Sequence, residues 1–587
     1  MKATPDIRKI SLFSLLVSFF FCALPASAGP KTLLIGIDGV QYERMMVLNL
    51  PNIKTLRIEP SYTGGIAGSS TRQATVSGPG WATVLTGVWA NKHFIIGNNT
   101  DPANSGYPSL FKRIRQSLPQ AYISSVVSWP DITQYYFKED VKDNDVDQRL
   151  SSDEAVISSA VNILRNHPAD FTFVQLSEPD LVGHDKCFGS QYNESLYRAD
   201  RHVRDLLAAV AARNKAEEDW LVLITTDHGR TPGNGCHHGN QTKEEKTTFI
   251  ASNKSMNPEF SNRLTGLENM DFSGIYGTAA QTSITPTILR HMGIVLKSEW
   301  LLDGNPLINE LSVRKPMISA LGRLRWHAGS GGVVSIYRDG TLVGEVPTIE
   351  NGWNDPHGSA GAEYSMVTNN TPVALSGINS VSAALEWTYP ISYYFFKDGR
   401  YMRYDNRRDM ADLPYPAPIF ENAWRGVSAY ANKVVGGVSR DGTIAYIFLN
   451  DGRYIRFNKK LDRADQGFPQ LINDINWSGM GVYAKNILTA VSWKENKMMF
   501  ILKDGRYVVF DYPSDRVVPG YPKPINNNTW PGVGDHVSDI VSMVKFDANI
   551  IFIFLKGNRY IKYNIAADRA EAGYPLPVNN NTWPGLL

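Results

Sequence analysis

The chain has 587 residues, of which 43% are hydrophobic and 20% are charged, and its formal net charge is +2. This length exceeds what one hydrophobic core holds, so we expect two to four domains of an ordinary globular protein. The near balance of charge gives no signal for nucleic-acid binding or for an anionic membrane as a partner.

The first 28 residues have the pattern of a secretory signal peptide. Lys2, Arg8 and Lys9 precede the apolar run "ISLFSLLVSFFFCALP", and small residues, "ASA", end the segment. The run is shorter than the roughly 20 residues of a membrane span, and no later segment is apolar enough to span. Removal of residues 1–28 brings the net charge to about zero. We predict an exported protein, periplasmic or secreted, without a membrane span.

The next 280 or so residues alternate predicted strands and helices, which favours an α/β domain with a mostly parallel sheet. Three strands of buried type, "TLLIGIDG", "FTFVQLSEPDLVGHD" and "WLVLITTDHGR", each lead into acids or histidines. In an open α/β sheet, sites form beyond the carboxyl ends of the strands. These ends supply Asp38, Asp180, His184, Asp227 and His228.

This combination of residues suits a divalent metal. A single Asp after a strand is ordinarily a helix cap or turn former, but three such ends with histidines are hard to explain by capping. Carboxylate and imidazole together bind zinc or a similar ion. Two more histidines, His237 and His238, follow in "NGCHHGNQT". With His238 included, the ligands are too many for one four-coordinate ion and suit two ions about 4 Å apart.

Ser77 lies in "VSGPGWATVLTG", just before a predicted helix. A helix N-terminus favours an anion, and metal coordination would activate the serine hydroxyl as a nucleophile. Pro79 is expected to fix the turn, while Gly78 and Gly80 let the backbone approach the substrate. The alternative is that Ser77 only caps the helix.

The motifs "IGIDG", "VSGPGWATVLTG", "EPDLVGHD", "TTDHGR" and "HHG", in this order, resemble the alkaline phosphatase superfamily. The most similar branch is the nucleotide pyrophosphatase/phosphodiesterase-like enzymes, and the resemblance covers about residues 30–310. It implies one zinc site from Asp180, His184 and His238, another from Asp38, Asp227 and His228, and Ser77 bridging to the second as the nucleophile.

Two departures from that branch affect the substrate. The branch usually has threonine where this chain has Ser77, and it has a phosphoryl-binding asparagine at the position compared with Gly80 of this chain. The predicted reaction is hydrolysis of a small-molecule or polymer phosphodiester through a phosphoserine. Phosphomonoester hydrolysis is an alternative, with Arg230 as the cation for the extra charge. A sulfatase is disfavoured, because Trp81 replaces the arginine of the motif that the modifying enzyme needs. A non-catalytic binding protein is a further alternative.

The resemblance also implies a disulfide. Cys187 lies three residues after His184, and Cys236 lies two residues before His238. Because both histidines are assigned to one zinc, their loops must meet, and an oxidising compartment would let the two cysteines pair.

Residues 312–379 are predicted to form a small β-sandwich-like spacer. The segment "VVSIYRDGTLVGEV" has the pattern of a hairpin around Asp339 and Gly340. With this spacer, the expected division is a signal peptide at 1–28, the metallohydrolase domain at 29–311, the spacer at 312–379 and a repeat domain at 380–587.

The last region repeats with a period of 53 residues. The repeat places tyrosines at Tyr401, Tyr454, Tyr507 and Tyr560, and tryptophans at Trp424, Trp477, Trp530 and Trp583. A fixed period near 50 with several short strands predicts a propeller, here with four blades. The units resemble hemopexin-like repeats. They either dock a polymer, a matrix or a heme-like ligand, or serve only as a scaffold, and they contain no catalytic constellation.

Overall fold

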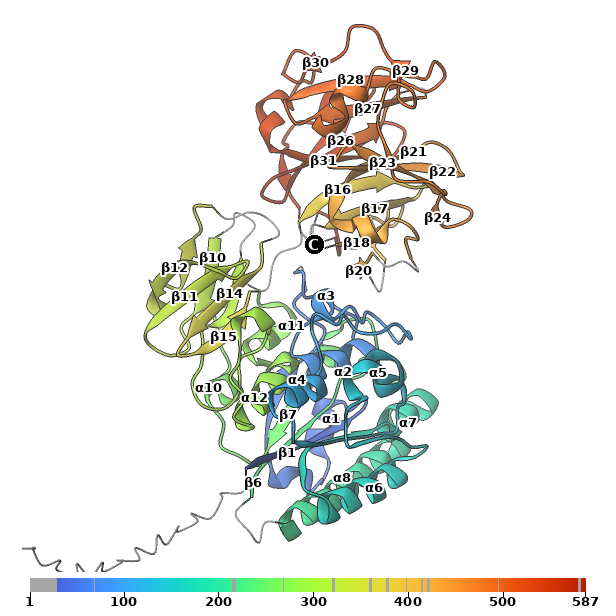
Figure 1. Ribbon diagram of the computed structural model, residues 1–587. Coiled ribbons are helices and arrows are strands. Elements are labelled where there is room, and N and C mark those ends of the chain that lie inside the picture. Colours follow the sequence, from blue (N-terminus) through green and yellow to red (C-terminus); the bar gives the residue numbers. More distant parts are fainter. Residues whose placement is uncertain are drawn as a thin grey trace, which may run out of the picture.

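The computed structural model describes residues 29–586, apart from 68, 214–217, 268, 319–322, 358–361, 376–379, 397–398, 413–414, 420–422, 495 and 579–581. The predicted signal peptide, residues 1–28, lies outside the described residues. An α/β region comes first along the chain, a small β region lies beside it, and a β-propeller lies above it (Figure 1). Over the described part of the chain, no helix is both long and apolar enough to cross a membrane.

The α/β region is built on one eight-stranded sheet. Its strands lie in the order β4-β3-β5-β1-β6-β7-β2-β8. The first five are parallel to their neighbours, and β7 runs antiparallel to both β6 and β2. The bounds are β1 (Pro30–Ile37), β2 (Arg57–Tyr62), β3 (Tyr122–Val127), β4 (Val146–Arg149), β5 (Ala169–Leu176), β6 (Asp219–Thr225), β7 (Thr247–Ser252) and β8 (Ala279–Ala280). The prediction of a mostly parallel α/β sheet is confirmed.

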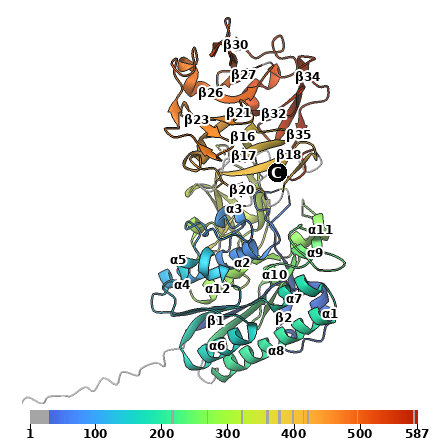
Figure 2. The same ribbon diagram turned by 90° about the vertical axis from the view of Figure 1, so that its right-hand side faces the viewer.

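Helices cover both faces of this sheet (Figure 2). Leu34 of β1 packs into a core shared with α2, α4 and α12, whereas its neighbours Leu33 and Ile35 pack on the other face with α6 and α8. This alternation follows from the two-residue period of a strand. The helices are α1 (Tyr42–Val47), α2 (Ser77–Thr86), α3 (Ala90–His93), α4 (Leu110–Ser117), α5 (Lys138–Val141), α6 (Asp153–Asn166), α7 (Glu178–Lys186), α8 (Ser190–Arg213), α9 (Lys243–Lys246), α10 (Pro258–Ser261), α11 (Asp271–Gly274) and α12 (Ile284–His291).

The small β region has two sheets that share one apolar core, which includes Leu324, Trp326 and Ile336. The first sheet has the order β13-β10-β9 and the second β12-β11-β14-β15. Asp339 and Gly340 both have positive φ, 48° and 78°, and form the predicted turn between β11 and β12. The strands are β9 (Arg314–Ile318), β10 (Arg323–His327), β11 (Val333–Arg338), β12 (Thr341–Pro347), β13 (Gly352–Asn354), β14 (Tyr364–Thr368) and β15 (Thr371–Ala374).

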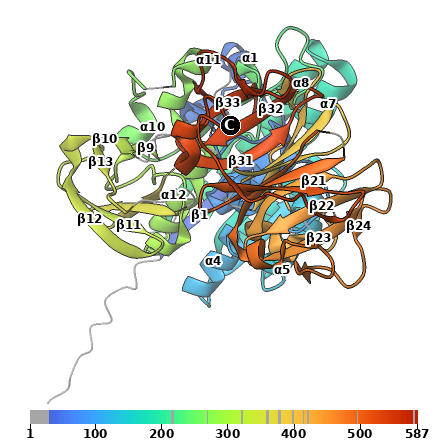
Figure 3. The same ribbon diagram turned by 90° about the horizontal axis from the view of Figure 1, so that it is seen from above.

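The propeller has four blades of antiparallel strands, seen from above in Figure 3. The inner strands are neighbours in a ring, with β16 of the first blade beside β31 of the last. The blades are β16 (Val381–Glu386), β17 (Ile391–Phe396), β18 (Arg400–Asp405) and β19 (Met410–Ala411); β21 (Val434–Ser439), β22 (Ile444–Leu449), β23 (Arg453–Asn458) and β24 (Arg463–Ala464); β26 (Ile487–Ser492), β27 (Lys497–Leu502), β28 (Arg506–Asp511) and β29 (Arg516–Val517); and β31 (Ile540–Lys545), β32 (Ile550–Leu555), β33 (Arg559–Asn564) and β34 (Arg569–Ala570). Each third strand also pairs with a two-residue strand: β20 (Ala417–Pro418), β25 (Gln470–Leu471), β30 (Lys523–Pro524) or β35 (Leu576–Pro577).

An equivalent backbone hydrogen bond joins each blade to the next, four bonds in all. In each, a carbonyl one residue after the repeat tryptophan accepts from an outer-strand amide: Ala464 to Arg425, Val517 to Ser478, Ala570 to Pro531 and Ala411 to Pro584. The last of these runs from the first blade to the C-terminal residues at 2.9 Å. The ring is therefore closed by the same contact that links consecutive blades, which confirms the predicted propeller.

Trp583 packs between the first and fourth blades, where the ring closes. Its ring centroid lies 5.7 Å from that of Tyr394 in the first blade and 5.2 Å from that of Phe554 in the fourth.

We expect Trp583→Ala to lower the free energy of unfolding of the propeller by about 3–5 kcal/mol, because it leaves a cavity between two blades. Chemical denaturation followed by near-UV circular dichroism measures this loss. Tyr389→Ala, at a position 61% exposed, is the control and should change stability by less than about 0.5 kcal/mol. Equal effects of the two changes would contradict the closing role of Trp583.

Candidate active site

The three strands that the sequence singles out are neighbours in the sheet, in the order β5-β1-β6, and they are parallel. Their carboxyl ends therefore meet at one edge. Asp38 directly follows β1, and its amide bonds to the carbonyl of Leu176 at the end of β5. Asp180 lies in the first turn of α7, just beyond β5. Asp227 and His228 follow β6. The structure thus brings all three predicted ends together.

One cluster of ligand atoms comes from Asp38, Asp227 and His228, whose ligand atoms lie within 4.8 Å of one another. His228 Nε2 is 3.6 Å from Asp38 Oδ1 and 3.3 Å from Asp227 Oδ2. Asp227 Oδ1 accepts the Gly39 amide at 3.2 Å, but Asp227 Oδ2 is buried and has no hydrogen-bond partner in the described part of the chain. A buried carboxylate oxygen without a hydrogen-bond partner is expected to bind a cation.

A second cluster comes from Asp180, His228 and His238, again within 4.8 Å. His184 faces the same point, because its Nε2 is 2.9 Å from His238 Nε2 and 3.3 Å from Asp180 Oδ2. His228 also stacks on His238, with ring centroids 3.8 Å apart. The sequence assigns His228 to one site alone, whereas the structure places it between both.

Hydrogen bonds set the tautomers of two histidines. His228 Nδ1 lies 2.8 Å from the carbonyl of Gly229, and His238 Nδ1 lies 3.1 Å from the carbonyl of Thr75. A carbonyl only accepts, so each Nδ1 carries the proton and each Nε2 keeps a lone pair. The lone pairs point toward the carboxylates, which is the arrangement of metal-binding histidines.

The electrostatics of the cluster also favour a cation. Burial, together with the charges of Asp227 and Asp180, raises the pKa of Asp38 well above its ordinary value. Burial and the charge of Asp180 raise the pKa of Asp227 to about 8. Burial lowers the pKa of His238 to about 4 and that of His228 well below its ordinary value. Neutral imidazoles beside crowded carboxyls fit divalent ions, which would favour the ionised acids.

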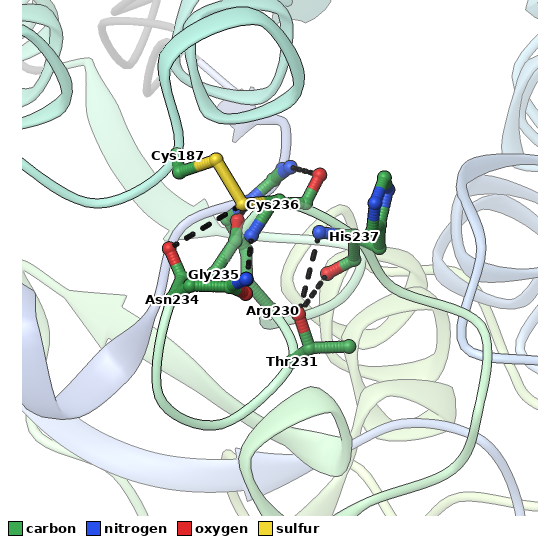
Figure 4. Close-up of a disulfide and its surroundings, with 7 residues drawn as sticks. All are labelled: Cys187, Arg230, Thr231, Asn234, Gly235, Cys236 and His237. Atoms are coloured by element: carbon green, nitrogen blue, oxygen red, sulfur yellow. Dashed lines mark hydrogen bonds between the residues drawn. A yellow bond between two sulfur atoms is a disulfide. The ribbon is translucent and has the colours of Figure 1, made fainter.

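Asp180 differs from the other two acids. Burial would raise its pKa, but hydrogen bonding from His184 and the charges of His228, His238 and Arg230 outweigh this and lower its pKa. The buried Arg230 guanidinium pairs with Asp180 and donates to the carbonyls of Gly235, at 2.5 Å, and Cys236, at 3.1 Å (Figure 4). Arg230 therefore holds Asp180, a candidate ligand, in place. The monoesterase alternative would instead need Arg230 to bind the substrate.

A disulfide joins Cys187 and Cys236, as the sequence predicts, with their Cα atoms 4.2 Å apart (Figure 4). It connects the end of α7 to the loop that leads to His238. The covalent link and the Arg230 bonds together hold this loop against α7, and so hold His184 and His238 together.

Ser77 is the first residue of α2 and is only 5% exposed. Its hydroxyl donates to Asp38 Oδ1 at 3.4 Å and lies 3.3 Å from His228 Nε2. The N-cap position belongs to Val76, whose side chain makes no capping bond. The alternative of Ser77 as the helix cap is therefore wrong, and its hydroxyl faces the first cluster of candidate ligands.

Two glycines let α2 sit close to the rest of the site. A Cβ on Gly80 would lie 2.8 Å from the backbone oxygen of Asp227, and a Cβ on Gly78 would lie 2.4 Å from that of Gly97. The sequence predicts that these glycines let the backbone approach the substrate. The contacts show that they also let neighbouring protein backbone approach α2.

Sequence reasoning missed Asn98. Its Oδ1 accepts the amide of Gly78 at 2.7 Å, so an asparagine does lie at the N-terminus of α2. This asparagine comes from the loop after α3, 20 residues beyond Gly78, and not from position 80. "IIGNNT" has no periodicity to mark it, and only similarity in fold could have found it. Tyr136 is near as well: its hydroxyl would lie 3.0 Å from a Cβ on Gly78.

Comparison with known proteins agrees with this geometry. Residues 32–280 match the family model of type I phosphodiesterase / nucleotide pyrophosphatase, and residues 381–426 and 488–535 match that of hemopexin. Human bis(5'-adenosyl)-triphosphatase ENPP4 is 23% identical over 254 residues, which are 38% of this chain and 52% of that protein. The chain thus spans about half the length of this curated relative. Human matrix metalloproteinase-21 is 26% identical over 198 residues, 32% of this chain and 33% of that protein.

Two solved structures are also similar. Murine ectonucleotide pyrophosphatase / phosphodiesterase 5 has 17% identity and a TM-score of 0.26, over 34% of this chain and 57% of that one. A 2-O GAG sulfatase has 11% identity and a TM-score of 0.34, over 65% of this chain and 86% of that one.

From these matches, residues 32–280 form a domain similar to the type I phosphodiesterase / nucleotide pyrophosphatase family, a family of metal-dependent enzymes, and hemopexin repeats follow in the same chain.

Proposed function

We propose that the protein hydrolyses phosphodiester bonds with two metal ions and a phosphoserine formed on Ser77. The observation that carries this proposal is the position of the Ser77 hydroxyl, at the head of α2 and between Asp38 and His228. Bis(5'-adenosyl)-triphosphatase is the name of a relative, so phosphoric anhydrides between nucleosides are within the proposed substrate class.

The residues of the two clusters would hold the ions, which we propose to be zinc. When bound, such ions polarise phosphoryl oxygens and make a hydroxyl a better nucleophile. The ligands of the proposed sites are Asp38, Asp227 and His228, and Asp180, His184 and His238. Donors of oxygen and imidazole nitrogen in this proportion suit zinc.

The chain's own groups supply the remaining chemistry. Asp38 Oδ1 is the acceptor to which the Ser77 hydroxyl points, so this bond orients the serine oxygen. In the proposed reaction, Ser77 Oγ attacks phosphorus while the bond to the leaving oxygen breaks, and water later cleaves the phosphoserine. The N-terminus of α2 and the Asn98 amide would bind the phosphoryl oxygens.

The alternatives fit the site less well. A monoesterase needs a free cation for the additional phosphate charge, and Arg230 is buried and bonded to Asp180, Gly235 and Cys236. In the sulfatase alternative an arginine would replace Trp81, whose indole donates to Asp38 Oδ2 at 2.9 Å. In a non-catalytic binding protein we would expect a missing ligand, and every predicted ligand lies at the site.

We further propose that the chain is exported and divides at residues 29–311, 312–379 and 380–587, and that the propeller docks the enzyme to a polymer, a matrix or a heme-like ligand. The separate sheets and separate apolar cores of the three regions support this division.

A panel of nitrophenyl esters tests the proposed reaction. We expect the zinc-loaded protein to hydrolyse bis(p-nitrophenyl) phosphate with a kcat/KM at least about tenfold above those for p-nitrophenyl phosphate and p-nitrophenyl sulfate, because Arg230, the candidate cation for a second charge, is already paired with Asp180. Release of nitrophenolate measures all three. Faster hydrolysis of the monoester or of the sulfate would contradict the proposal.

Ser77→Ala should lower kcat by roughly 10³-fold or more, because it removes the proposed nucleophile and leaves the ligands in place. The control is Ser124→Ala, which removes another buried hydroxyl, one bonded to Thr172 in the sheet, and should keep its activity. Steady-state rates and zinc content are measured together. If Ser77→Ala retained a rate within a few fold of the unchanged protein, Ser77 would not be the nucleophile.

Asp227→Asn and Asp180→Asn should each remove one of two bound zinc ions. Each should lower kcat/KM by at least about a hundredfold, since even outer-shell changes at metal sites cost 10–100-fold. Elemental analysis gives the zinc per chain. Asp200→Asn is the matched control, because Asp200 is a buried carboxylate that binds the amides of Asn52 and Ile53 away from the site. Two zinc ions retained in either site variant would show that the assignment is wrong.

A further inference from the structure

Two loops flank the candidate nucleophile, and the propeller touches both. The first, residues 63–76, connects β2 to α2, and the second, residues 94–109, connects α3 to α4. The short helix α3, which leads into the second loop, lies directly below the propeller in two perpendicular views (Figures 1 and 2). The contacts between the propeller and these loops bear on the geometry of the site.

The first contact is a hydrogen bond from Arg72 Nη1 to the carbonyl of Gly585, at 3.2 Å. The bond links the C-terminal end of the propeller to the residue before Gln73. Gln73 in turn binds α2, because its amide donates to the carbonyl of Pro79 at 3.2 Å and to Thr83 Oγ1 at 3.0 Å. The same loop therefore connects the propeller to the helix that begins with Ser77.

This loop also reaches one of the candidate metal ligands. The carbonyl of Thr75, three residues after Arg72, accepts the Nδ1–H of His238 and so sets the orientation of that imidazole. A shift of the loop would move the acceptor and turn the ring.

The second contact is apolar. Ile96 packs against the apolar core between the first and second blades, which includes Phe395, Tyr401 and Trp424. The next two residues contact the N-terminus of α2: the oxygen of Gly97 lies against Gly78, and Asn98 accepts the Gly78 amide. Ile96 is thus the propeller-facing end of a three-residue segment whose other end contacts α2.

The two ends of the second loop are anchored, because Ile95 is buried in the α/β core and the amide of Ala103 donates to the carbonyl of Tyr136. Between them, no backbone group of residues 96–102 bonds to another backbone group in the described part of the chain. A segment without such bonds keeps its position mainly through its side-chain contacts. For this segment these are the packing of Ile96 on the propeller and the bond between Asn98 and Gly78.

We propose that the propeller positions both loops for catalysis, and that Arg72 and Ile96 are the positioning residues through which it acts. This inference rests on the proposed phosphoryl transfer, in which Asn98 and His238 take part. The propeller is then a structural part of the active site in addition to any docking role.

Variants of the full-length protein test this proposal. We expect Ile96→Ser to lower kcat/KM for bis(p-nitrophenyl) phosphate about 10- to 100-fold at unchanged zinc content, since misplacement of a catalytic group by 1 Å can cost that much. Arg72→Met should in addition weaken zinc binding about tenfold, as expected for a change behind a ligand. Ile96→Val and Arg72→Lys keep the contacts and should stay within about threefold of the unchanged protein.

A control variant and a readout that needs no substrate complete the test. Ile349→Ser removes an isoleucine side chain that is 77% exposed in the small β region and should have no effect. Amide hydrogen exchange of peptides covering residues 94–102 should rise in Ile96→Ser and remain unchanged in Ile349→Ser. Unchanged exchange in this loop, or an unchanged kcat/KM in both Ile96→Ser and Arg72→Met, would overturn the positioning role.

The failure of the two proposals can be told apart. If the protein without substitutions cleaves no phosphodiester, the proposed function fails. The exchange and zinc measurements then still decide whether the propeller holds the loops.

Discussion

The crowding of three carboxylates, Asp38, Asp180 and Asp227, at one edge of the sheet is the constraint on which the structure depends. Burial and their mutual repulsion raise the pKa of Asp38 and Asp227, and two imidazole lone pairs face them. A protein with this arrangement must either keep protons on its acids or bind cations there. The parallel neighbours β5, β1 and β6 impose the arrangement, because their carboxyl ends all meet at one edge.

The groups around this edge each restrain one candidate ligand or the proposed nucleophile. Arg230 stabilises the charged form of Asp180, and the disulfide holds the loop of His238 against α7. α2 brings Ser77 to the cluster, and its close approach to Asp227 requires glycine at position 80. The propeller adds contacts at Arg72 and Ile96 to the loops on either side of that helix. Restraints of this kind keep a reactive group within a fraction of an ångström of its working position.

Much of this could be predicted from the sequence, because the signals are local. Acids directly after apolar strands indicated the candidate ligands, and the 53-residue period predicted the four blades. Contacts between distant segments could not be predicted. The role of Asn98 depends on where an aperiodic loop folds back onto α2, and the pairing of Arg230 with Asp180 depends on the orientation of its side chain. The placement of His228 between both clusters follows from strand order, which no local pattern contains.

Whether the two clusters are metal sites can be measured by anomalous diffraction at the zinc edge, from crystals of the full-length protein grown with zinc. We expect two peaks in each chain, one among Asp38, Asp227 and His228 and the other among Asp180, His184 and His238, with Ser77 Oγ beside the first. No peak at this edge of the sheet, or zinc bound only elsewhere in the chain, would contradict this expectation.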